Sequence, residues 1–325
     1  MFQIQRIEEI VGKENVRSQE MLSNHTTFRI GGPAKWYVEP LIIEDLLLVL
    51  HYLREQGEPY YILGNGSNVL VNDTGMDGVV ICTHSGRGGT LELVECFAGE
   101  QEMHQFFFER GYCTPEEIKG KRLLSAGSGA LLSQVASEAA KNSLTGLEFA
   151  SGIPGTLGGA VTMNAGAYGG EIQDVIVAAR VLDQDDKIRI LGREELELGY
   201  RSSIIQRENM IVLDALFALV PGEEQQIRDA MKDYNERRRE KQPLEYGSAG
   251  STFKRPEGHF AGKLIQDAGL RGYRVGDVMV SEKHCGFVVN VGQGTCKQAD
   301  QVIEHVQKTV YEQFGVKLET EVKRW

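Results

Sequence analysis

The stretch Ser125–Glu171 reads SAGSGALLSQVASEAAKNSLTGLEFASGIPGTLGGAVTMNAGAYGGE, and its glycines lie between short runs of apolar and small residues. Glycine inside a regular element costs about 0.5–1 kcal/mol relative to alanine. A cluster this dense therefore needs a physical reason. Tight turns explain any single glycine. For the whole cluster we favour a binding surface of exposed peptide N–H groups, called the glycine bed below, which suits a large, phosphate-bearing cofactor.

A second glycine loop lies upstream, where Gly64–Asn68 (GNGSN) separates two apolar runs of strand character. The chain has no GxxxxGK[ST] motif, which excludes a P-loop. The loop also lacks the third glycine of the dinucleotide fingerprint, and β-branched residues stand where a helix should open. What remains is a turn whose N–H groups and Ser and Asn side chains could bind a pyrophosphate.

Length and composition limit the class of protein. The 325 residues suffice for two or three domains, and the net charge of −11 argues against nucleic acid as a partner. The charged N-terminus does not resemble a signal peptide, and the longest apolar runs are too short to cross a membrane. We therefore expect a cytoplasmic protein. Five cysteines without a CxxC pair predict free thiols, and seven scattered histidines predict no metal site.

Hydrophobic periodicity predicts the elements along the chain. Helices are expected over residues 1–22, 42–56 with Gly57 as cap, 133–142, 222–241, 262–272 and 296–314, and a further helix ending at Gly111. Strands are expected before the turn at 31–33 and over 60–63, 175–183, 187–191, 210–220 and 317–325. Because the composition changes near Pro221, we place a domain boundary there.

Several blocks together allow a family to be recognised. They are NHTTFRIGGPA (24–34), ILGNGSNVLV (62–71), GLEFASGIPGTLGGAVTMNAGAYGGE (146–171), GYRSS (199–203), KQP…GSAGSTFKRP (241–256), AGKLIQDAGLRG (261–272), HCGFVVN (284–290) and LETEV (318–322). Because it carries these blocks in this order, the chain resembles the UDP-N-acetylenolpyruvoylglucosamine reductase (MurB) family, in its shorter subtype. Residues 84–124 are longer and less regular than the family's connection, and we assign them no role.

The resemblance implies an α+β fold. It consists of an FAD-binding module of the vanillyl-alcohol-oxidase (PCMH) type with two subdomains, plus a separate α+β substrate-binding domain. We expect the first subdomain over 1–82, joined by the terminal strand 315–325, the second over 83–220, and the substrate domain over 221–314.

The resemblance also implies an activity. It is the NADPH-dependent, FAD-mediated reduction of UDP-N-acetyl-3-O-(1-carboxyvinyl)-glucosamine to UDP-N-acetylmuramate in peptidoglycan precursor synthesis, with hydride passing from flavin N5 to the alkene. FAD is expected to be noncovalent, the partner to be this UDP-N-acetylglucosamine enolpyruvate, and the protein to be a monomer. Two alternatives stay open: a flavin-dependent alcohol oxidase on the same scaffold, and a non-catalytic nucleotide-sugar binding protein.

Such a reduction needs positive charge at the substrate carboxylate and a proton for carbon. Ser251 matches the family's proton donor, although a turn serine bonding to local backbone is the simpler reading of spacing alone. Arg201 matches the arginine that polarises the carboxylate, since a guanidinium can bind it through two hydrogen bonds. Tyr200 matches a substrate-binding tyrosine. For both residues the alternative is a strand-end salt bridge with a packed ring.

The resemblance selects Glu321 in LETEV as the catalytic glutamate. Glu319 lies two residues earlier, and on a strand both side chains would share one face, so the residues alone do not choose between them. The alternative is a solvated terminal strand.

The run Arg237–Lys241 is a dense basic segment in an acidic chain, and Arg238 and Lys241 are expected to bind the pyrophosphate of the substrate. Cations also favour helix C-termini, which is the competing explanation.

The predicted cofactor-binding residues come from the two glycine-rich segments. They are Gly64, Asn65, Gly66, Ser67, Asn68, Gly127, Ser151, Gly152, Ile153, Pro154, Gly155, Gly158, Gly159, Asn164, Gly166 and Gly170.

Overall fold

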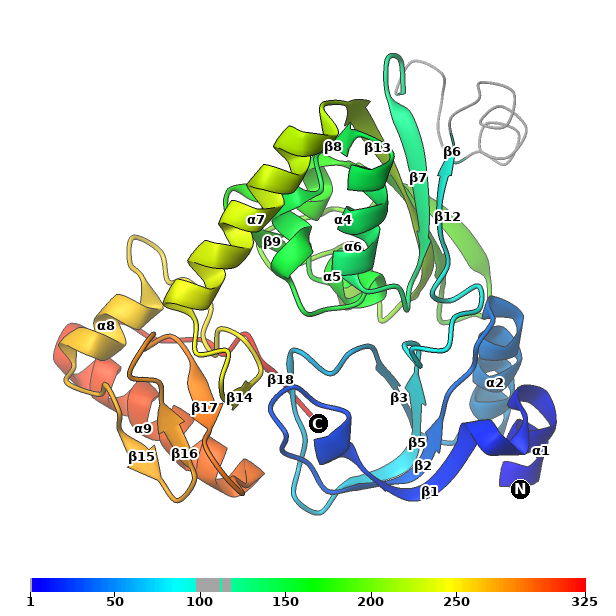
Figure 1. Ribbon diagram of the computed structural model, residues 1–325. Coiled ribbons are helices and arrows are strands. Elements are labelled where there is room, and N and C mark those ends of the chain that lie inside the picture. Colours follow the sequence, from blue (N-terminus) through cyan, green and yellow to red (C-terminus); the bar gives the residue numbers. More distant parts are fainter. Residues whose placement is uncertain (1, 98–111, 113–117) are drawn as a thin grey trace.

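The structure is a computed structural model that describes residues 2–97, 112 and 118–325. Three parts meet around a central region: the N-terminal part at the lower right of Figure 1, a second part above it, and a third part at the lower left. The helix expected to end at Gly111 lies outside the described residues.

The N-terminal part is a four-stranded sheet in the order β1-β2-β5-β3, with two helices beside it. Its elements are α1 (Ile4–Val11), β1 (Val16–Met21), β2 (Pro33–Val38), α2 (Ile43–Gln56), β3 (Tyr60–Leu63) and β5 (Met76–Cys82), with 3-10 turns at Lys13–Asn15 and Leu22–Asn24. Strands β2 and β3 both run parallel to β5. The carboxyl ends of β3 and β5 therefore lie at one edge of the sheet, which brings the loops after Leu63 and Cys82 together.

The helix predicted over 1–22 is wrong beyond Val11. Helix α1 ends at Gly12, whose φ of +87 is not helical. Residues Val16–Met21 instead form β1, which pairs antiparallel with β2. Backbone pairing across the sheet overrides the continued apolar spacing that favoured a longer helix. The helix predicted over 42–56 is confirmed as α2, with Gly57 at φ +63 as its cap.

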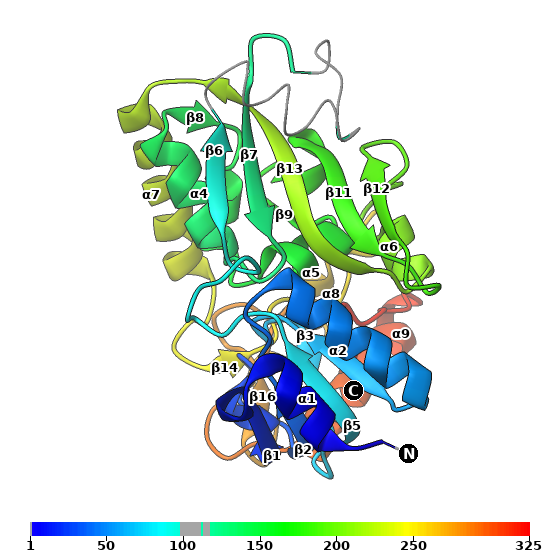
Figure 2. The same cartoon turned by 90° about the vertical axis from the view of Figure 1, so that its right-hand side faces the viewer.

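The second part is a sheet in the order β12-β11-β13-β7-β6, with β8 paired to the end of β13. Its strands are β6 (Val94–Phe97), β7 (Arg122–Gly127), β8 (Leu144–Thr145), β11 (Ile176–Leu182), β12 (Ile188–Gly192) and β13 (Ile211–Pro221). Figure 2 shows this sheet face-on, with α4 and α7 behind it. The connecting elements are α4 (Leu132–Lys141), η4 (Glu148–Gly152), α5 (Leu157–Thr162), β9 (Gly166–Ala167), β10 (Gly170–Glu171), η5 (Ile172–Asp174) and α6 (Ile204–Arg207).

Helix α7 (Glu224–Lys241) packs on this second part rather than on the third. Its buried Ile227 faces Gly222, and its Met231 packs against the core that contains Phe149 and Leu219. We keep the three-part division as a proposal, with the boundary moved from Pro221 to the end of α7. A polar composition marked α7 as a separate unit in the sequence, but composition does not show where a helix packs.

The third part is a small sheet in the order β14-β17-β16-β15, covered by two helices. Its elements are β14 (Gly247–Ser248), α8 (Ala261–Asp267), β15 (Arg274–Val275), β16 (Val278–Val280), β17 (Val288–Asn290) and α9 (Cys296–Phe314). Phe28, Ile30 and Leu70 of the N-terminal part belong to the same core as these elements. The third part is thus joined to the first by shared apolar packing.

The chain end lies against the N-terminal part, with less strand than predicted. Only β18 (Lys323–Arg324) is a strand, and it pairs in parallel with β4 (Val69–Leu70). Thr320 adds a single bridge to Phe253. In the part of the chain that the structure describes, four cysteines are free, and no helix is long and apolar enough to cross a bilayer.

Candidate active site

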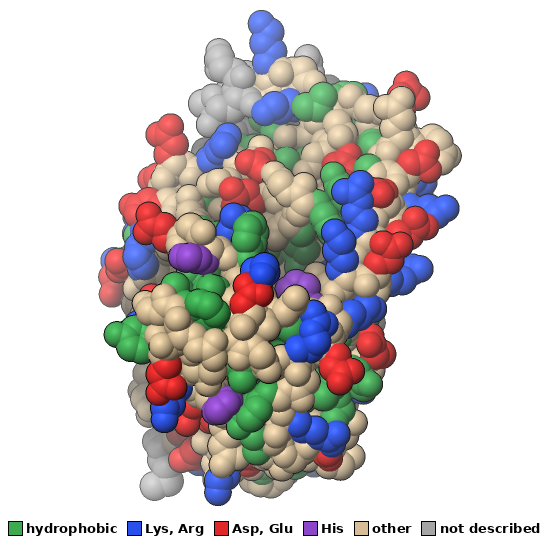
Figure 3. Space-filling view, turned by 90° about the vertical axis from the view of Figure 1, so that its left-hand side faces the viewer, with side chains coloured by type: hydrophobic (Ala, Val, Ile, Leu, Met, Phe, Trp, Pro, Cys, Tyr) green, Lys and Arg blue, Asp and Glu red, His purple; other side chains and the backbone are tan. Residues whose placement is uncertain are grey.

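A cavity of about 780 Å³ opens where the three parts meet, and Arg201, Ser251 and Glu321 all line it. The Gly64–Asn68 loop and most of the segment 153–167 form further parts of its wall. Figure 3 shows a hollow on this side of the molecule, with Lys and Arg side chains gathered along one edge. Three residues that are 50 to 120 positions apart in sequence are therefore brought to one place.

Arg201 is held by its neighbours before any ligand binds. Its Nε donates to Glu321 Oε1 at 2.6 Å, and its two terminal nitrogens face the carbonyl oxygens of Asn164 and Gly166 at 3.5 Å. The side chains of Arg201 and Glu321 are only 20% and 14% exposed. Arg201 has φ +54 within the tight turn Gly199–Ser202. A non-glycine residue in this conformation costs about 1–3 kcal/mol, and such strain clusters at functional sites.

Glu321 is placed beside the Ser251 segment by backbone pairing. Phe253 forms an isolated antiparallel bridge with Thr320, and Glu321 N–H donates to Thr252 O at 2.8 Å. The two chain segments are thus fixed side by side at the residues that flank the cavity.

Ser251 itself is exposed, and its Oγ makes no hydrogen bond to any residue that the structure describes. Gly250 precedes it with φ +76, a conformation that glycine adopts without the steric cost of a side chain. The buried Thr252 follows, and its Oγ accepts from Val288 N–H at 2.9 Å. A fixed backbone therefore presents a free hydroxyl, whereas the turn-serine alternative would have required a local bond.

The two C-terminal glutamates have different surroundings. Glu319 is 68% exposed and lies 3.4 Å from Lys254 Nζ. Glu321 instead pairs with Arg201 in the cavity. The expectation that both share one face rested on a regular strand, and the structure has only a bridge at Thr320 here. The geometry therefore favours Glu321.

Eleven of the predicted cofactor residues line the cavity. They are Gly64, Asn65, Gly66, Ser67, Asn68, Ile153, Pro154, Gly155, Gly158, Gly159 and Gly166. A Cβ added at Gly155 or Gly159 would meet no protein atom closer than 3.6 Å, so there a side chain would project into open space. At Gly66 (φ +60), by contrast, a Cβ would lie 2.0 Å from His25 O, so this glycine serves the close approach of two backbones.

The remaining predicted cofactor residues do not line it. They are Gly127, Ser151, Gly152, Asn164 and Gly170. Packing explains the glycines: a Cβ at Gly127 would strike Leu91 O, and one at Gly170 would strike Phe149. Asn164 is fully buried, and its side chain bonds to Glu171, Gly199 and Gln173. These five assignments stay predictions, to which the geometry adds no support.

Some lining residues were missed by sequence reasoning. Ser128 Oγ, Gln206 Oε1 and Gln242 Oε1 are buried without a hydrogen-bond partner among the described residues, and all three residues line the cavity. Buried polar atoms in native proteins nearly always have a partner, so these point to a polar ligand. Ser128 lies within the GSG turn of the glycine-rich stretch and could have been noticed. Gln242 lies in the block 241–256 that carried the family resemblance but was given no role, and no sequence signal marked Gln206 or Trp325.

Of the predicted substrate residues, Arg238 lines the cavity, whereas Tyr200 and Lys241 do not. Burial lowers the pKa of Arg238 below its usual value, and no carboxylate within the described residues pairs with it. Tyr200 is 54% exposed, its hydroxyl accepts from Arg255 N–H at 3.0 Å, and its ring lies 5.2 Å from the Arg201 guanidinium. The partly buried guanidinium of Arg238, which has no carboxylate partner among the described residues, is suited to an anionic ligand.

The glycine-lined bed with its unpartnered polar atoms fits an elongated polar cofactor, and the surrounding fold supports the same class. The family described as "FAD binding domain" matches residues 109–192. The fold and the site thus define an FAD-dependent oxidoreductase, with the two-subdomain module expected from the sequence.

Further comparisons identify the family. The C-terminal domain of UDP-N-acetylenolpyruvoylglucosamine reductase matches residues 242–325. The chain is 49% identical to the reductase of this name from Lachnoclostridium phytofermentans, over 98% of this chain and 96% of that protein. It is 51% identical to that from Agathobacter rectalis, over 94% and 92%. The crystal structure of the Thermus caldophilus enzyme superposes with a TM-score of 0.74 at 33% identity, covering 95% and 99%.

The chain therefore belongs to the UDP-N-acetylenolpyruvoylglucosamine reductase family. This confirms the resemblance, the fold class and the assignment as an oxidoreductase. The match to the FAD-binding family also confirms FAD as the expected cofactor.

Proposed function

We propose that this cavity reduces UDP-N-acetyl-3-O-(1-carboxyvinyl)-glucosamine to UDP-N-acetylmuramate with electrons from NADPH, and that Ser251 gives the proton. The observation that carries the proposal is the convergence of Arg201, Ser251 and Glu321 on one cavity with the glycine bed. We further propose that the protein acts as a cytoplasmic monomer in peptidoglycan precursor synthesis.

When bound, FAD supplies the hydride that adds to the terminal carbon of the alkene. Negative charge then develops on the neighbouring carbon and the carboxylate, which is where this chain must act. Arg201 supplies a guanidinium whose orientation is fixed by Glu321 before the substrate arrives. Such preorganisation means that the charge is stabilised without rearrangement of the site during the reaction.

Ser251 suits the protonation step because its hydroxyl has no hydrogen-bond partner among the described residues and is adjacent in sequence to the anchored Thr252. A serine hydroxyl is a weak acid, but the carbanionic centre that it must protonate is strongly basic. Arg238, unpaired and lining the same cavity, is placed to bind the diphosphate of the substrate.

The proposal is tested with Ser251→Ala in anaerobic half-reactions followed at the flavin absorbance. Reduction by NADPH should persist, while reoxidation by the enolpyruvyl sugar should slow by about 10²-fold or more, as for loss of a general acid. Ser248→Ala is the matched control, because Ser248 lies three residues earlier and does not line the cavity.

Equal losses in both half-reactions would contradict the role of Ser251. Rapid reoxidation by O₂ with an alcohol as reductant, and no response to the alkene, would support an oxidase instead. Binding of the UDP-sugar without any flavin reduction would support a non-catalytic protein.

A further inference from the structure

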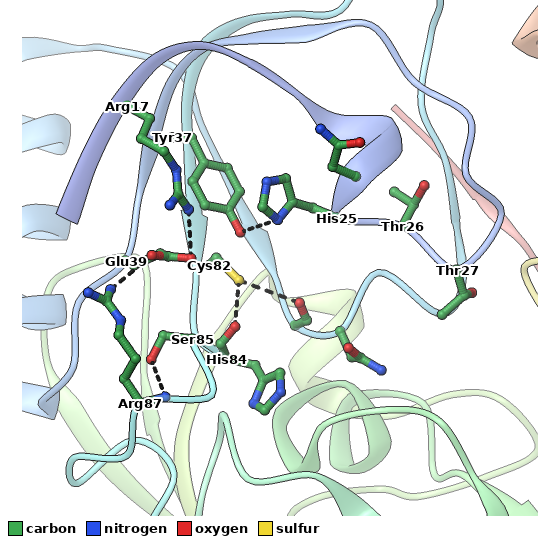
Figure 4. A pocket seen from close by; sticks show the side chains of 13 residues that line it. Arg17, His25, Thr26, Thr27, Tyr37, Glu39, Cys82, His84, Ser85 and Arg87 are labelled. Carbon is green, nitrogen blue, oxygen red and sulfur yellow. Dashed lines mark hydrogen bonds and ion pairs between the residues drawn. The ribbon is translucent and has the colours of Figure 1, made fainter. Parts of the chain in front are cut away.

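A second cavity, of about 530 Å³, shares Gly64 and Asn65 with the candidate active site. The turn at these two residues therefore forms a wall between the two cavities. Figure 4 shows the second cavity, with Tyr37 and His25 on one side of it and His84, Ser85 and Arg87 on the other. No sequence motif gave His84, Ser85 or Arg87 a role.

The arginines of this second cavity already have a partner. Arg17 and Arg87 bind the two carboxylate oxygens of Glu39, each at 2.8 Å. The pair is thus neutralised in part by the carboxylate between them, which argues against a site for a free anion. His84 differs from the arginines, because its side chain bonds to the backbone of a neighbouring loop.

His84 makes such a bond. Its Nδ1 lies 3.0 Å from Gly129 O and 3.3 Å from Glu92 Oε2. Both neighbours are acceptors, which assigns the ring hydrogen to Nδ1. Glu92 is itself fixed, because its other oxygen accepts from the backbone N–H groups of Ser85 and Gly86 at 2.7 and 2.9 Å. The imidazole is 16% exposed and held in one orientation.

The backbone around His84 is joined to the Gly64 turn. Thr83 N–H donates to Leu63 O at 2.8 Å. The Cys82 thiol lies within hydrogen-bond reach of both Gly64 O, at 3.6 Å, and His84 O, at 3.1 Å. His84 thus starts from the edge of the sheet that carries the first glycine loop.

Gly129, whose carbonyl oxygen accepts from His84, belongs to the second glycine-rich segment, which forms the other half of the glycine bed. Its neighbours bind the start of α5: Gly158 N–H donates to Ser128 O, and Leu157 N–H donates to Ala130 O, both at 2.8 Å. A Cβ at Gly129 would lie 1.9 Å from Thr83 O, so the two halves are in close backbone contact. The side chain of His84 therefore connects the two glycine-rich segments from outside the active-site cavity.

We propose that His84 is a positioning residue for FAD. Through its bond to Gly129 O it fixes the spacing between the Gly64 turn and the Ser128–Ala130 turn, and this spacing sets the affinity of the bed for the cofactor. His84 does not line the active-site cavity, so it acts through the two loops. The inference concerns FAD alone and does not depend on the identity of the substrate or on the role of Ser251.

The test measures FAD release when the purified holoenzyme is diluted, by the rise in flavin fluorescence. His84→Ala should raise the dissociation constant by about tenfold, because it leaves Gly129 O and Glu92 without their donor. His84→Asn keeps an N–H group near the position of Nδ1 and should stay within about threefold of the unsubstituted protein. His259→Ala, at an exposed histidine outside both cavities, is the matched control.

Glu92→Gln provides a second variant in case His84→Ala does not fold. Its amide N–H would face Nδ1 and favour the other tautomer, which cannot donate to Gly129 O, so FAD should again bind about tenfold more weakly. In both variants, kcat at saturating FAD should remain that of the unsubstituted enzyme.

An unchanged dissociation constant in both variants would overturn the proposal. So would equal weakening by His84→Ala and His84→Asn with a parallel fall in the melting temperature of the FAD-free protein, since that is the result of a purely structural role.

Discussion

Arg201 and Glu321 form an ion pair that spans 120 positions of sequence and that lies in the cavity wall. Because both side chains are largely buried, removing either one would leave the other charge without its partner. Ser251 differs from them, since its hydroxyl has no partner in the part of the chain that the structure describes. The site therefore combines two mutually fixed charged groups with one unconstrained donor.

The two basic residues expected to bind the pyrophosphate differ in their position. Arg238 lines the cavity and Lys241 does not. Arg238→Gln should raise KM for the UDP-sugar by about tenfold or more with little change in kcat, because a charged hydrogen bond contributes roughly 1.5–3 kcal/mol. Lys241→Gln should change KM by less than about twofold, the effect of a solvated charge. Steady-state kinetics with both variants checks this, and the reverse order would contradict the placement.

Among the elements, helix α9 shows how the parts of the protein are joined. Asp73, in the loop after β4, accepts from Cys296 N–H at 2.7 Å and from Lys297 N–H at 3.0 Å. Thr295 caps the same helix through Gln298 N–H. A carboxylate of the N-terminal part thus satisfies two free N–H groups at the start of a helix in the third part, where the helix dipole also favours it.

Asp73→Ala should lower the free energy of unfolding by about 1–2 kcal/mol, the usual effect of losing a helix cap. Urea denaturation followed by circular dichroism measures it. Asp77→Ala is the matched control: Asp77 is 89% exposed and its ion pair within the described residues is with Lys35 at the surface, so its loss should change stability by less than about 0.5 kcal/mol. Equal effects of the two substitutions would mean that the cap does not stabilise the docking of α9.

The folded molecule buries the thiol of Cys82 in a core of the N-terminal part. Burial raises the pKa of Cys82 to about 11. In the unfolded chain a thiol has a pKa near 8.5, so between these values the folded state holds a proton that the unfolded state loses. A group with a raised folded pKa contributes stability that is present below the unfolded pKa and is lost as the pH rises toward the folded one.

We therefore expect the free energy of unfolding to fall between about pH 8.5 and pH 11, by up to roughly 3 kcal/mol from Cys82. Cys82→Ser has a hydroxyl that does not titrate there, so its stability should fall less steeply. Part of the slope should remain, since burial also raises the pKa of Cys296 to about 12. Urea unfolding at a series of pH values compares the slopes, and parallel curves would contradict a role for Cys82.

Local sequence was sufficient for helices, whose backbone hydrogen bonds are internal, and for strands whose long apolar runs mark them as buried. The helix α2 with its glycine cap, the helix α9 and the strands β11 and β13 were predicted from periodicity close to their observed bounds. The prediction over 1–22 failed because β1 exists only through its partner β2. Likewise, the domain boundary at Pro221 followed composition, while the packing of α7 depends on a surface distant in sequence.

The sequence by itself determined the family, the cofactor class and the two glycine-rich segments, because turns and close backbone approaches leave glycine as a local signature. Only the tertiary structure decided between Glu319 and Glu321, separated Arg238 from Lys241, and brought Ser128 and Gln242 to the cavity wall. The physical reason is that these distinctions depend on which side chains share one enclosed space. That sharing is set by strand pairing and packing between segments far apart in the chain.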